Sequence, residues 1–583
     1  MSLNQLHLTC SRPRRRAWAT LLSGALIASV QQPARADDDA IARIVRAAAE
    51  ARVDNGEAVG VGVGVITGDG PARTFSFGLA DVGKGQPFTS GSIFQIGSVT
   101  KVFTTNLLGQ AVSEGTLSLD KPLSDYAAQL GPLQPLTAQV TLGELGDFTA
   151  GFPQYAPRCT ATDTPPGCLP GDRPDIETYS ASDFAAFFRS TVPMDQTATP
   201  PIPVGALPAP YFYSDYSTGL LGLLLGAPPD QPLGNDALAG WESLLQTELL
   251  DPIGMPHTTL SLPTKPALGT NIAQGYTRAL AEATVANGQV AGLTVTAGGS
   301  YSSGAPEVTI VGGGGTGAQA QAVLTDETVS DLQLIDPGQG YTAPPVVSIA
   351  PPTGAGGTPV TGEAVVIDGQ VVGVNLTDRG GGYTEPPVVT ITGGRESGGR
   401  DATAAAHVAN GEVTYISVTD GGAGYVPPVA VLIAPSPVPP TNVPIWAPAG
   451  ALKSTIRDMD RFARAALGDS ESEAVAAGFK VAQMPYACSE PNHSVMQCPA
   501  GAILSALAWA VRPADAADGL PEIIVKNGGL PGFSTQVLLM PARHLGVVVF
   551  VNTNQSTDSG EKLQEAGKVA YDILYGLFYQ GSE

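Results

Sequence analysis

The spacing of hydrophobic residues divides the chain into strand-like and helix-like stretches. Residues 59–67 alternate almost throughout and end at a Gly-Asp-Gly turn, which predicts a strand and a hairpin to a partner strand over 73–80. Strand-like stretches return within 523–552, before a helical pattern over 561–579. Helical spacing predicts further helices over 40–52, 98–112, 142–145, 181–188, 217–225, 241–250 and 454–467. Strands at both ends, with helices between them, imply an antiparallel sheet shared by the termini and an α+β fold class.

The pattern changes abruptly near residue 283, where aliphatic residues begin to alternate with polar ones and glycines cluster. Four repeats of about 40 residues follow, marked by tyrosines that are 40, 42 and 42 residues apart: Tyr301, Tyr341, Tyr383 and Tyr425. We therefore predict an inserted all-β module over 283–437. It would divide the other domain into residues 37–282 and 438–583.

The first 36 residues have the pattern of an export signal. A cluster of arginines precedes an apolar run over 17–30, and Ala34-Arg35-Ala36 offers a small-x-small cleavage site. The run is too short for a transmembrane helix, and we find no other stretch that is apolar enough to span a bilayer. The sequence therefore predicts a periplasmic or secreted protein.

The cysteines agree with export. Beyond the signal, Cys159 and Cys168 form one close pair in the sequence, and Cys488 and Cys498 form another. Each pair lies in a Pro-rich or polar stretch, which suggests two local disulfides, although the spacing leaves all three connectivities open.

Charge and histidine content limit the possible functions. The net charge of −23 would repel a phosphate backbone, so we expect no nucleic-acid partner. The five histidines are scattered along the chain, and they support neither a zinc site nor a Ser-His-Asp triad. We therefore expect no metal and no cofactor.

The strongest candidate for chemistry is Ser98-x-x-Lys101, which follows Gly97 at the predicted start of a helix. Three residues along a helix place the Lys101 side chain on the same face as the Ser98 hydroxyl. A partly desolvated lysine amine can take the proton of a serine hydroxyl and make it a nucleophile. Serine three residues before lysine also occurs by chance, so the motif needs support from elsewhere in the chain.

A second candidate is Tyr213-Ser214-Asp215, at the start of an apolar helix. A tyrosine, with an ordinary pKa of about 10, acts as a base only where nearby cations stabilise its phenolate. Lys101 and a second lysine could supply that charge. Taken alone, Tyr213 is better explained as a tyrosine packed at a helix start.

The third candidate is Lys526-Asn527-Gly528-Gly529, which we place at the end of a strand in the C-terminal meander. Lys526 would face the site, and the glycines would let a substrate lie along the strand edge. The backbone N–H groups of Gly529 and Ser98 would together form an oxyanion hole. The alternative is an exposed lysine in a turn.

Together, these three motifs resemble those of the class C β-lactamase family, which also contains esterases and D-alanyl-D-alanine carboxypeptidases. The resemblance covers about residues 40–280 and 444–580. It also rests on Glu114–Asp120, Thr149–Gly151, Asp251–Met255, Ala273–Tyr276, Lys453–Met459 and Pro531–Phe533.

The resemblance implies a role for each candidate residue. Ser98 would be the acylated nucleophile, and Lys101 and Tyr213 would transfer protons. Lys526 would bind substrate, and Gln154 would contact a substrate amide.

Two residues depart from the family pattern. Asp215 stands where the family usually has asparagine, so it cannot donate a hydrogen bond to a substrate amide carbonyl, although it could pair with Lys101. Asn527 stands where the β-lactamases have threonine. Both changes count more against efficient β-lactam turnover than against ester or peptide hydrolysis.

These observations leave several functional hypotheses. The first is an exported serine hydrolase of β-lactam or related amide and ester bonds. A carboxylesterase or a D-alanyl-D-alanine carboxypeptidase on the same fold is the alternative. A hypothesis of another class is a surface-binding protein, in which the module over 283–437 binds a cell-wall or surface partner.

Overall fold

The protein is described here from a computed structural model. Its strands between 280 and 438 are described by their backbone alone. The other described residues are 34–54, 57–68, 70–82, 84–155, 179–234, 236–261, 271–277, 445–489, 498–554 and 565–580. Most of the predicted export signal, together with Cys159 and Cys168, lies outside the described residues.

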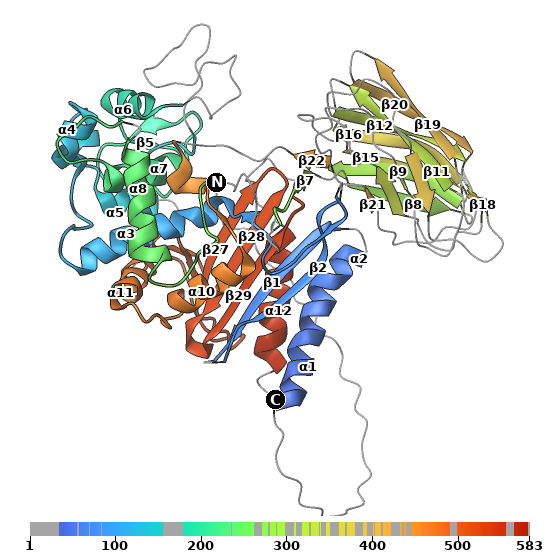
Figure 1. Cartoon of the computed structure of the whole chain (residues 1–583). Helices are drawn as coiled ribbons and strands as arrows, with labels where there is room; N and C mark the ends of the chain where they lie inside the picture. Colours follow the sequence, from blue (N-terminus) through green and yellow to red (C-terminus); the bar gives the residue numbers. More distant parts are fainter. Residues whose placement is uncertain are drawn as a thin grey trace, which may run out of the picture.

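A large antiparallel sheet joins the two ends of the chain (Figure 1). Its strands follow the order β24-β25-β26-β27-β28-β29-β1-β2-β3. β29 pairs with β1 from Val61↔Val551 to Thr67↔Leu545, which confirms the predicted sheet shared by the termini and the α+β class. The strands are β1 (Gly60–Thr67), β2 (Arg73–Asp81), β3 (Gln86–Pro87), β24 (Ala487–Cys488), β25 (Leu504–Ser505), β26 (Ala510–Arg512), β27 (Ile523–Leu530), β28 (Phe533–Met540) and β29 (Leu545–Val551).

The valine–glycine alternation of β1 determines what packs on each face of the sheet. Its valines join the core beneath α12 (Glu565–Gln580) and the N-terminal helix, which runs through α1 (Ala34–Val45), η1 (Arg46–Glu50) and α2 (Ala51–Asp54). On the other face, α10 (Ile456–Ala466) packs against the glycines. A Cβ on Gly64 would lie 1.9 Å from Asp460 Oδ1, so only glycine admits this helix.

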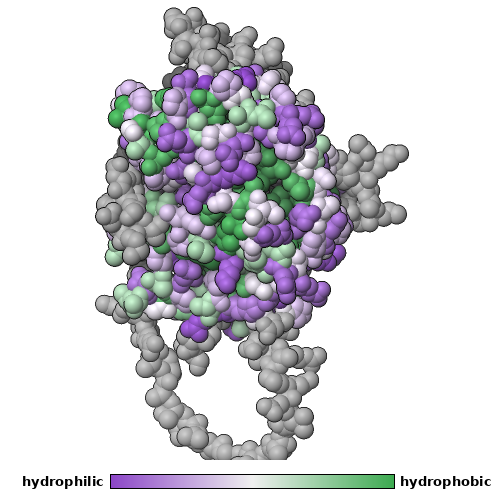
Figure 2. All heavy atoms as spheres, turned by 90° about the vertical axis from the view of Figure 1, so that its left-hand side faces the viewer, coloured by the Kyte–Doolittle hydropathy of each residue, from purple (hydrophilic) through white to green (hydrophobic). Residues whose placement is uncertain are grey.

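The helical region lies beside the sheet. Its helices are α3 (Thr100–Ser113), α4 (Ala127–Leu130), α5 (Leu142–Asp147), α6 (Ala181–Ser190), α7 (Asp215–Gly226), α8 (Asp236–Leu244) with η6 (Leu245–Leu250), α9 (Ala447–Gly450) and α11 (Glu473–Ala482). Figure 2 shows this side of the molecule, where hydrophobic residues gather near the middle of a largely hydrophilic face.

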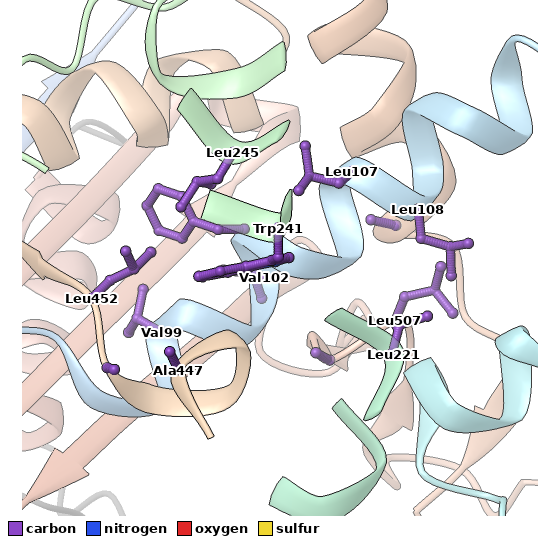
Figure 3. Packing of buried hydrophobic residues seen from close by; sticks show 14 of the residues in the cluster. Val99, Val102, Leu107, Leu108, Leu221, Trp241, Leu245, Ala447, Leu452 and Leu507 are labelled. Atoms are coloured by element: carbon purple, nitrogen blue, oxygen red, sulfur yellow. The ribbon is translucent and has the colours of Figure 1, made fainter. Parts of the chain in front are cut away.

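Helix α3 is the centre of this region. Residues 100–110 are all buried, and Figure 3 shows Val102, Leu107 and Leu108 among hydrophobic residues of other segments. The buried polar side chains are satisfied by main-chain groups: Thr104 Oγ1 donates to Pro448 O at 2.7 Å, and Thr105 Oγ1 donates to Leu507 O at 2.8 Å. These hydrogen bonds tie α3 to segments far along the chain.

Short strands and the predicted inserted region complete the architecture. Between 280 and 438, antiparallel hairpins β8–β9, β11–β12, β15–β16 and β19–β20 follow one another along the chain. Their bounds are Leu280–Ala286, Gln289–Ala297, Ala318–Thr325, Thr328–Asp336, Thr361–Ile367, Gln370–Asp378, Thr403–Ala409 and Glu412–Asp420. The four marker tyrosines lie outside the described residues, and the domain boundaries and the repeat module stay predictions.

The remaining strands are β4 (Phe94–Gln95), β5 (Met194–Asp195), β6 (Ile202–Pro203), β7 (Gly275–Thr277), β10 (Val308–Thr309), β13 (Gly338–Gln339), β14 (Val346–Ile349), β17 (Val389–Thr392), β18 (Arg400–Asp401), β21 (Leu432–Ile433), β22 (Ser436–Val438) and β23 (Lys453–Ser454).

One of the two predicted cysteine pairs lies within the described residues. Cys488 and Cys498 form a disulfide, as one of the two predicted local pairs. Among the helices of the described residues, none has the length and hydropathy needed to cross a membrane.

Candidate active site

The nucleophile candidate Ser98 lies in a tight turn between a strand and a helix. Strand β4 leads into the 3₁₀ turn η2 (Gly97–Val99), and α3 begins at Thr100. Gly97 has a φ of +52°, a left-handed conformation that favours glycine. Thr100 Oγ1 donates to Gly97 O at 2.7 Å and so braces the turn. This geometry leaves Ser98 half-buried at the start of α3, as the sequence predicted.

Lys101 is fully buried, and all three of its N–H donors have partners. It donates to Ser98 Oγ at 2.9 Å and to the main-chain oxygen of Ala449 at 2.8 Å, and it forms an ion pair with Asp215. The structure therefore brings Ser98, Lys101 and Asp215 together. These three contacts fix the position of the Lys101 amine beside the Ser98 hydroxyl.

Tyr213 precedes α7 and lies between two lysines. Lys101 Nζ is 5.0 Å from the centroid of its ring, and Lys526 Nζ is 5.2 Å from it. The phenol also shares a hydrogen bond with Ser98. Ser214 caps α7 by accepting from Ser217 N at 2.9 Å, which fixes the residue next to Tyr213.

The structure places two lysines beside Tyr213, as the sequence suggested, but burial opposes a phenolate in the free site. Burial, and secondly the charge of Asp215, raise the pKa of Tyr213 well above 10, against the opposing effect of the Ser98 hydrogen bond. The two lysines do not reverse this, because Asp215 balances the charge of Lys101 and Lys526 is itself only partly charged near neutral pH. Tyr213 is therefore a phenol at neutral pH.

Lys526 is 3% exposed, and its side chain forms no hydrogen bond or ion pair within the described part of the chain. Burial, and secondly the charge of Lys101, lower the pKa of Lys526 to about 7, while Asp215 acts in the opposite direction. The alternative of an exposed turn lysine is therefore wrong. Lys526–Gly529 form the C-terminal part of β27, as predicted, and pairing with β28 continues to Leu530↔Phe533.

The edge of β27 beyond Val525 is open on one side. β26 pairs only with Ile523–Val525, so from Lys526 onward this edge faces the Ser98 turn instead. A Cβ on Gly528 would lie 2.1 Å from Ile96 O, and one on Gly97 would lie 3.0 Å from Gly529 N. The glycines thus allow the strand and the turn to touch, and this contact brings the two backbone segments of the predicted oxyanion hole together.

Gln154 lies near this group without joining it. Its amide donates to Tyr155 OH at 3.0 Å, and its main-chain oxygen accepts from Tyr216 N at 3.2 Å. The described contacts include none between its side chain and Ser98 or Lys101. Asn527, the other departure from the family pattern, is exposed on β27.

The sequence did not point to two contributors to this site. Tyr155 is one of them: its phenol oxygen accepts from the Gln154 amide at 3.0 Å, and the charges of Asp215 and Lys101 both act on it. The main-chain oxygen of Ala449 holds Lys101 from a segment 348 residues away. A main-chain carbonyl oxygen cannot be recognised in a sequence. The only sequence hint for Tyr155 is its position next to Gln154.

Comparison with known proteins identifies the family. A family model described as β-lactamase matches residues 45–330 and 392–571, which is more than half of the chain. The chain belongs to the β-lactamase family. Among curated β-lactamases, the one from Escherichia coli (strain K12) is 30% identical over 217 residues, covering 37% of this chain and 47% of the relative. The one from Pseudomonas fluorescens is 29% identical over 240 residues, covering 41% and 56%. This family member thus matches about half the length of these relatives.

Two solved structures of class C β-lactamases align with most of this chain. A class C β-lactamase from Rhodobacter sphaeroides aligns with 92% of this chain and 99% of its own, at 17% identity and a TM-score of 0.47. Another class C β-lactamase aligns with 94% and 99%, at 17% identity and a TM-score of 0.49.

Proposed function

We propose that this β-lactamase-family protein is an exported serine hydrolase, which cleaves β-lactam or related amide and ester bonds through an acyl-enzyme on Ser98. The observation that carries the proposal is the 2.9 Å hydrogen bond between Ser98 Oγ and Lys101 Nζ. The same hydroxyl contacts the Tyr213 phenol. A nucleophile in contact with two proton-transfer groups is the arrangement that acyl transfer requires.

The charge state of Lys101 suggests the order of proton transfers. Lys101 is a donor to Ser98 in the free site, so it must first lose a proton, and Asp215 is its ion-pair partner. A proton moves from Lys101 to Asp215, and the amine then takes the Ser98 proton as Oγ bonds to the substrate carbonyl carbon. The phenol of Tyr213 gives its proton to the leaving group, and Lys101 restores it. Water then attacks the ester carbonyl and gives one proton to the Lys101 amine. Lys101 passes this proton to Ser98 Oγ as the acid leaves, and Asp215 returns the first proton to Lys101.

The open edge of β27 would hold the substrate. The backbone N–H groups of Ser98 and Gly529 would stabilise the oxyanion of the tetrahedral intermediate. Lys526, which has no carboxylate partner in the described residues, would attract a negative group of the substrate.

Asp215 favours a second candidate, a carboxylesterase with little β-lactam turnover. Its carboxylate accepts hydrogen bonds and cannot donate one to an amide carbonyl. An ester substrate loses less from this change than a substrate recognised through a side-chain amide. A D-alanyl-D-alanine carboxypeptidase would use the same acyl-enzyme chemistry.

Export is supported by the Cys488–Cys498 disulfide, because disulfides persist in oxidising compartments. The surface-partner hypothesis for 283–437 rests on the sequence alone.

Mass spectrometry tests the proposal directly. The full protein is incubated with a penicillin or with an activated ester, and the intact mass and the product are followed. Ser98→Ala removes the nucleophile, and Ser190→Ala, at an exposed position on α6, is the matched control. We expect an adduct or turnover with the wild type and the control but not with Ser98→Ala. Turnover that survives in Ser98→Ala would refute the acyl-enzyme, and inertness toward both reagents would refute the assigned substrate classes.

A further inference from the structure

Three lysines are buried in the part of the chain that the structure describes: Lys101, Lys453 and Lys526. The first is paired with Asp215, and the second and third have no carboxylate within ion-pair distance among those residues. Lys526 faces the proposed substrate edge, whereas Lys453 has no role in the proposed reaction. A buried ammonium without a counter-charge is costly, so the surroundings of Lys453 suggest a missing partner.

Lys453 lies on β23 and is 7% exposed. It donates one described hydrogen bond, to Leu260 O at 2.6 Å, although an ammonium carries three donors. Burial lowers its pKa. The Lys453 ammonium therefore has fewer acceptors than donors and no counter-charge among the described residues. A further hydrogen-bond acceptor would stabilise its charged form.

Gln95 lies directly opposite Lys453 in the antiparallel β4–β23 pair. Residues opposite each other in such a pair project to the same face. Gln95 is 4% exposed, and its carboxamide makes no hydrogen bond to a described residue. Two buried polar side chains, one cationic and one a neutral amide donor, therefore lie side by side with unused donors.

Both side chains line the same cavity, which has a volume of about 130 Å³. Its apolar wall comprises Ile93, Ile272, Ala273 and Phe533. Asp81 also lines it, but this carboxylate is paired with Lys84. A dry cavity of about 150 Å³ holds benzene in another protein, so this space suits a molecule of about five or six heavy atoms. None of its lining residues belongs to the proposed catalytic set.

We propose that this cavity is a binding site for a small aliphatic carboxylate of two to four carbons. The carboxylate would accept from Lys453 Nζ and the Gln95 amide, and the alkyl end would pack against the apolar wall. The charge of Lys453 favours an anion, and the apolar wall favours a carboxylate over an inorganic ion. The site is separate from Ser98, so it stands whether or not the proposed hydrolase activity is found.

Thermal unfolding of the full chain in sodium propionate tests this site. Sodium chloride at equal ionic strength controls for salt, and propionamide, a neutral molecule of similar shape, controls for alkyl packing. We expect propionate to raise Tm with saturation, and chloride and propionamide to have no comparable effect, because binding to the folded state stabilises it. No saturable rise with propionate, or an equal rise with chloride, would overturn the proposal.

Single substitutions test whether propionate raises Tm by binding in this cavity. Lys453→Met should abolish the propionate-dependent rise and should itself raise Tm, since it removes an unpaired buried charge. Lys526→Met should keep the rise, which separates this cavity from the other buried lysine. Gln95→Met should weaken the rise, and it provides the test if Lys453→Met fails to fold. A rise that persists in Lys453→Met, or that is lost in Lys526→Met and kept in Gln95→Met, contradicts the assignment.

Discussion

The two halves of the candidate site differ in how completely their charges are balanced. On the helical side, Lys101 is saturated by Ser98, Ala449 and Asp215. On the strand side, Lys526 is equally buried but has no partner in the described residues beyond the ring of Tyr213. On the helical side, every donor of Lys101 has a partner without substrate. On the strand side, the charge of Lys526 has no counter-charge among the described residues and lies beside the open edge of β27.

This difference separates the two tasks of the site. A saturated network fixes the positions of the nucleophile and its proton carriers, because each lost partner would leave a buried charge uncompensated. An under-compensated cation instead gains from a ligand. We therefore infer that the helical half positions the reacting groups and that the strand half provides much of the affinity for substrate.

The largest effect is expected from Lys101→Met. Removing the proton carrier should lower kcat by about 10²–10⁴-fold, the usual contribution of general acid–base catalysis. It also leaves the half-buried Asp215 carboxylate without its partner, so Tm should fall. Steady-state kinetics and thermal unfolding measure both effects, and Lys480→Met, at an exposed position on α11, is the control. A kcat within threefold of wild type would show that Lys101 is only structural.

Gly528→Ala tests the contact between the halves. The new Cβ would meet Ile96 O at 2.1 Å, a distance that forces the turn and the strand apart. Because a displaced catalytic group can cost about 10²-fold, we expect kcat/KM to fall by about that factor. Gly205→Ala, where a Cβ would meet nothing within 4 Å, should leave activity unchanged. Equal activity of the two variants would refute the close contact.

The sequence predicted which segments of the chain lie together better than it predicted the burial and charge around single residues. The spacing of Ser98 and Lys101 predicted that their side chains share one face, and the structure places them 2.9 Å apart. The glycines after Lys526 were expected to make room for substrate, and the structure shows that they also allow a close contact between β27 and the Ser98 turn. The pKa of Tyr213 could not be predicted from the sequence, because it depends on burial and on Asp215. The Lys453–Gln95 pair depends on a strand pairing between segments 358 residues apart in the sequence.

Lys526→Met is expected to have a smaller effect, and one that depends on pH. Below pH 7 the wild-type lysine is charged, so the variant should raise KM for an anionic substrate by about tenfold, the value of about 1.4 kcal/mol. Above pH 7 the wild type loses this charge and the two proteins should converge. A KM difference that stays constant from pH 5.5 to 8.5 would contradict the lowered pKa of Lys526.

The stability of the same variant gives an independent check. The pKa of Lys526 is lowered from 10.5 to about 7 on folding, so the unfolded chain binds more protons between these values and wild-type stability rises with pH across that window. The stability gained by Lys526→Met should therefore be largest below pH 7 and disappear above about pH 10.5. Denaturant unfolding at several pH values measures this trend.

Asp215→Asn makes the helical half resemble the usual family pattern, and only a modest shift in substrate preference is expected from it. An amide can donate to a substrate carbonyl, a hydrogen bond worth about 0.5–1.5 kcal/mol, so the ratio of penicillin to ester kcat/KM should rise by up to about tenfold. The substitution also removes the carboxylate that we propose takes a proton from Lys101, so the ester kcat should fall. Asp125→Asn, at an exposed position, is the matched control. If the ratio is unchanged while the ester kcat falls, Asp215 acts as a proton acceptor and does not set substrate preference. If the ratio rises while the ester kcat is retained, Asp215 acts through specificity alone and another group must receive the Lys101 proton.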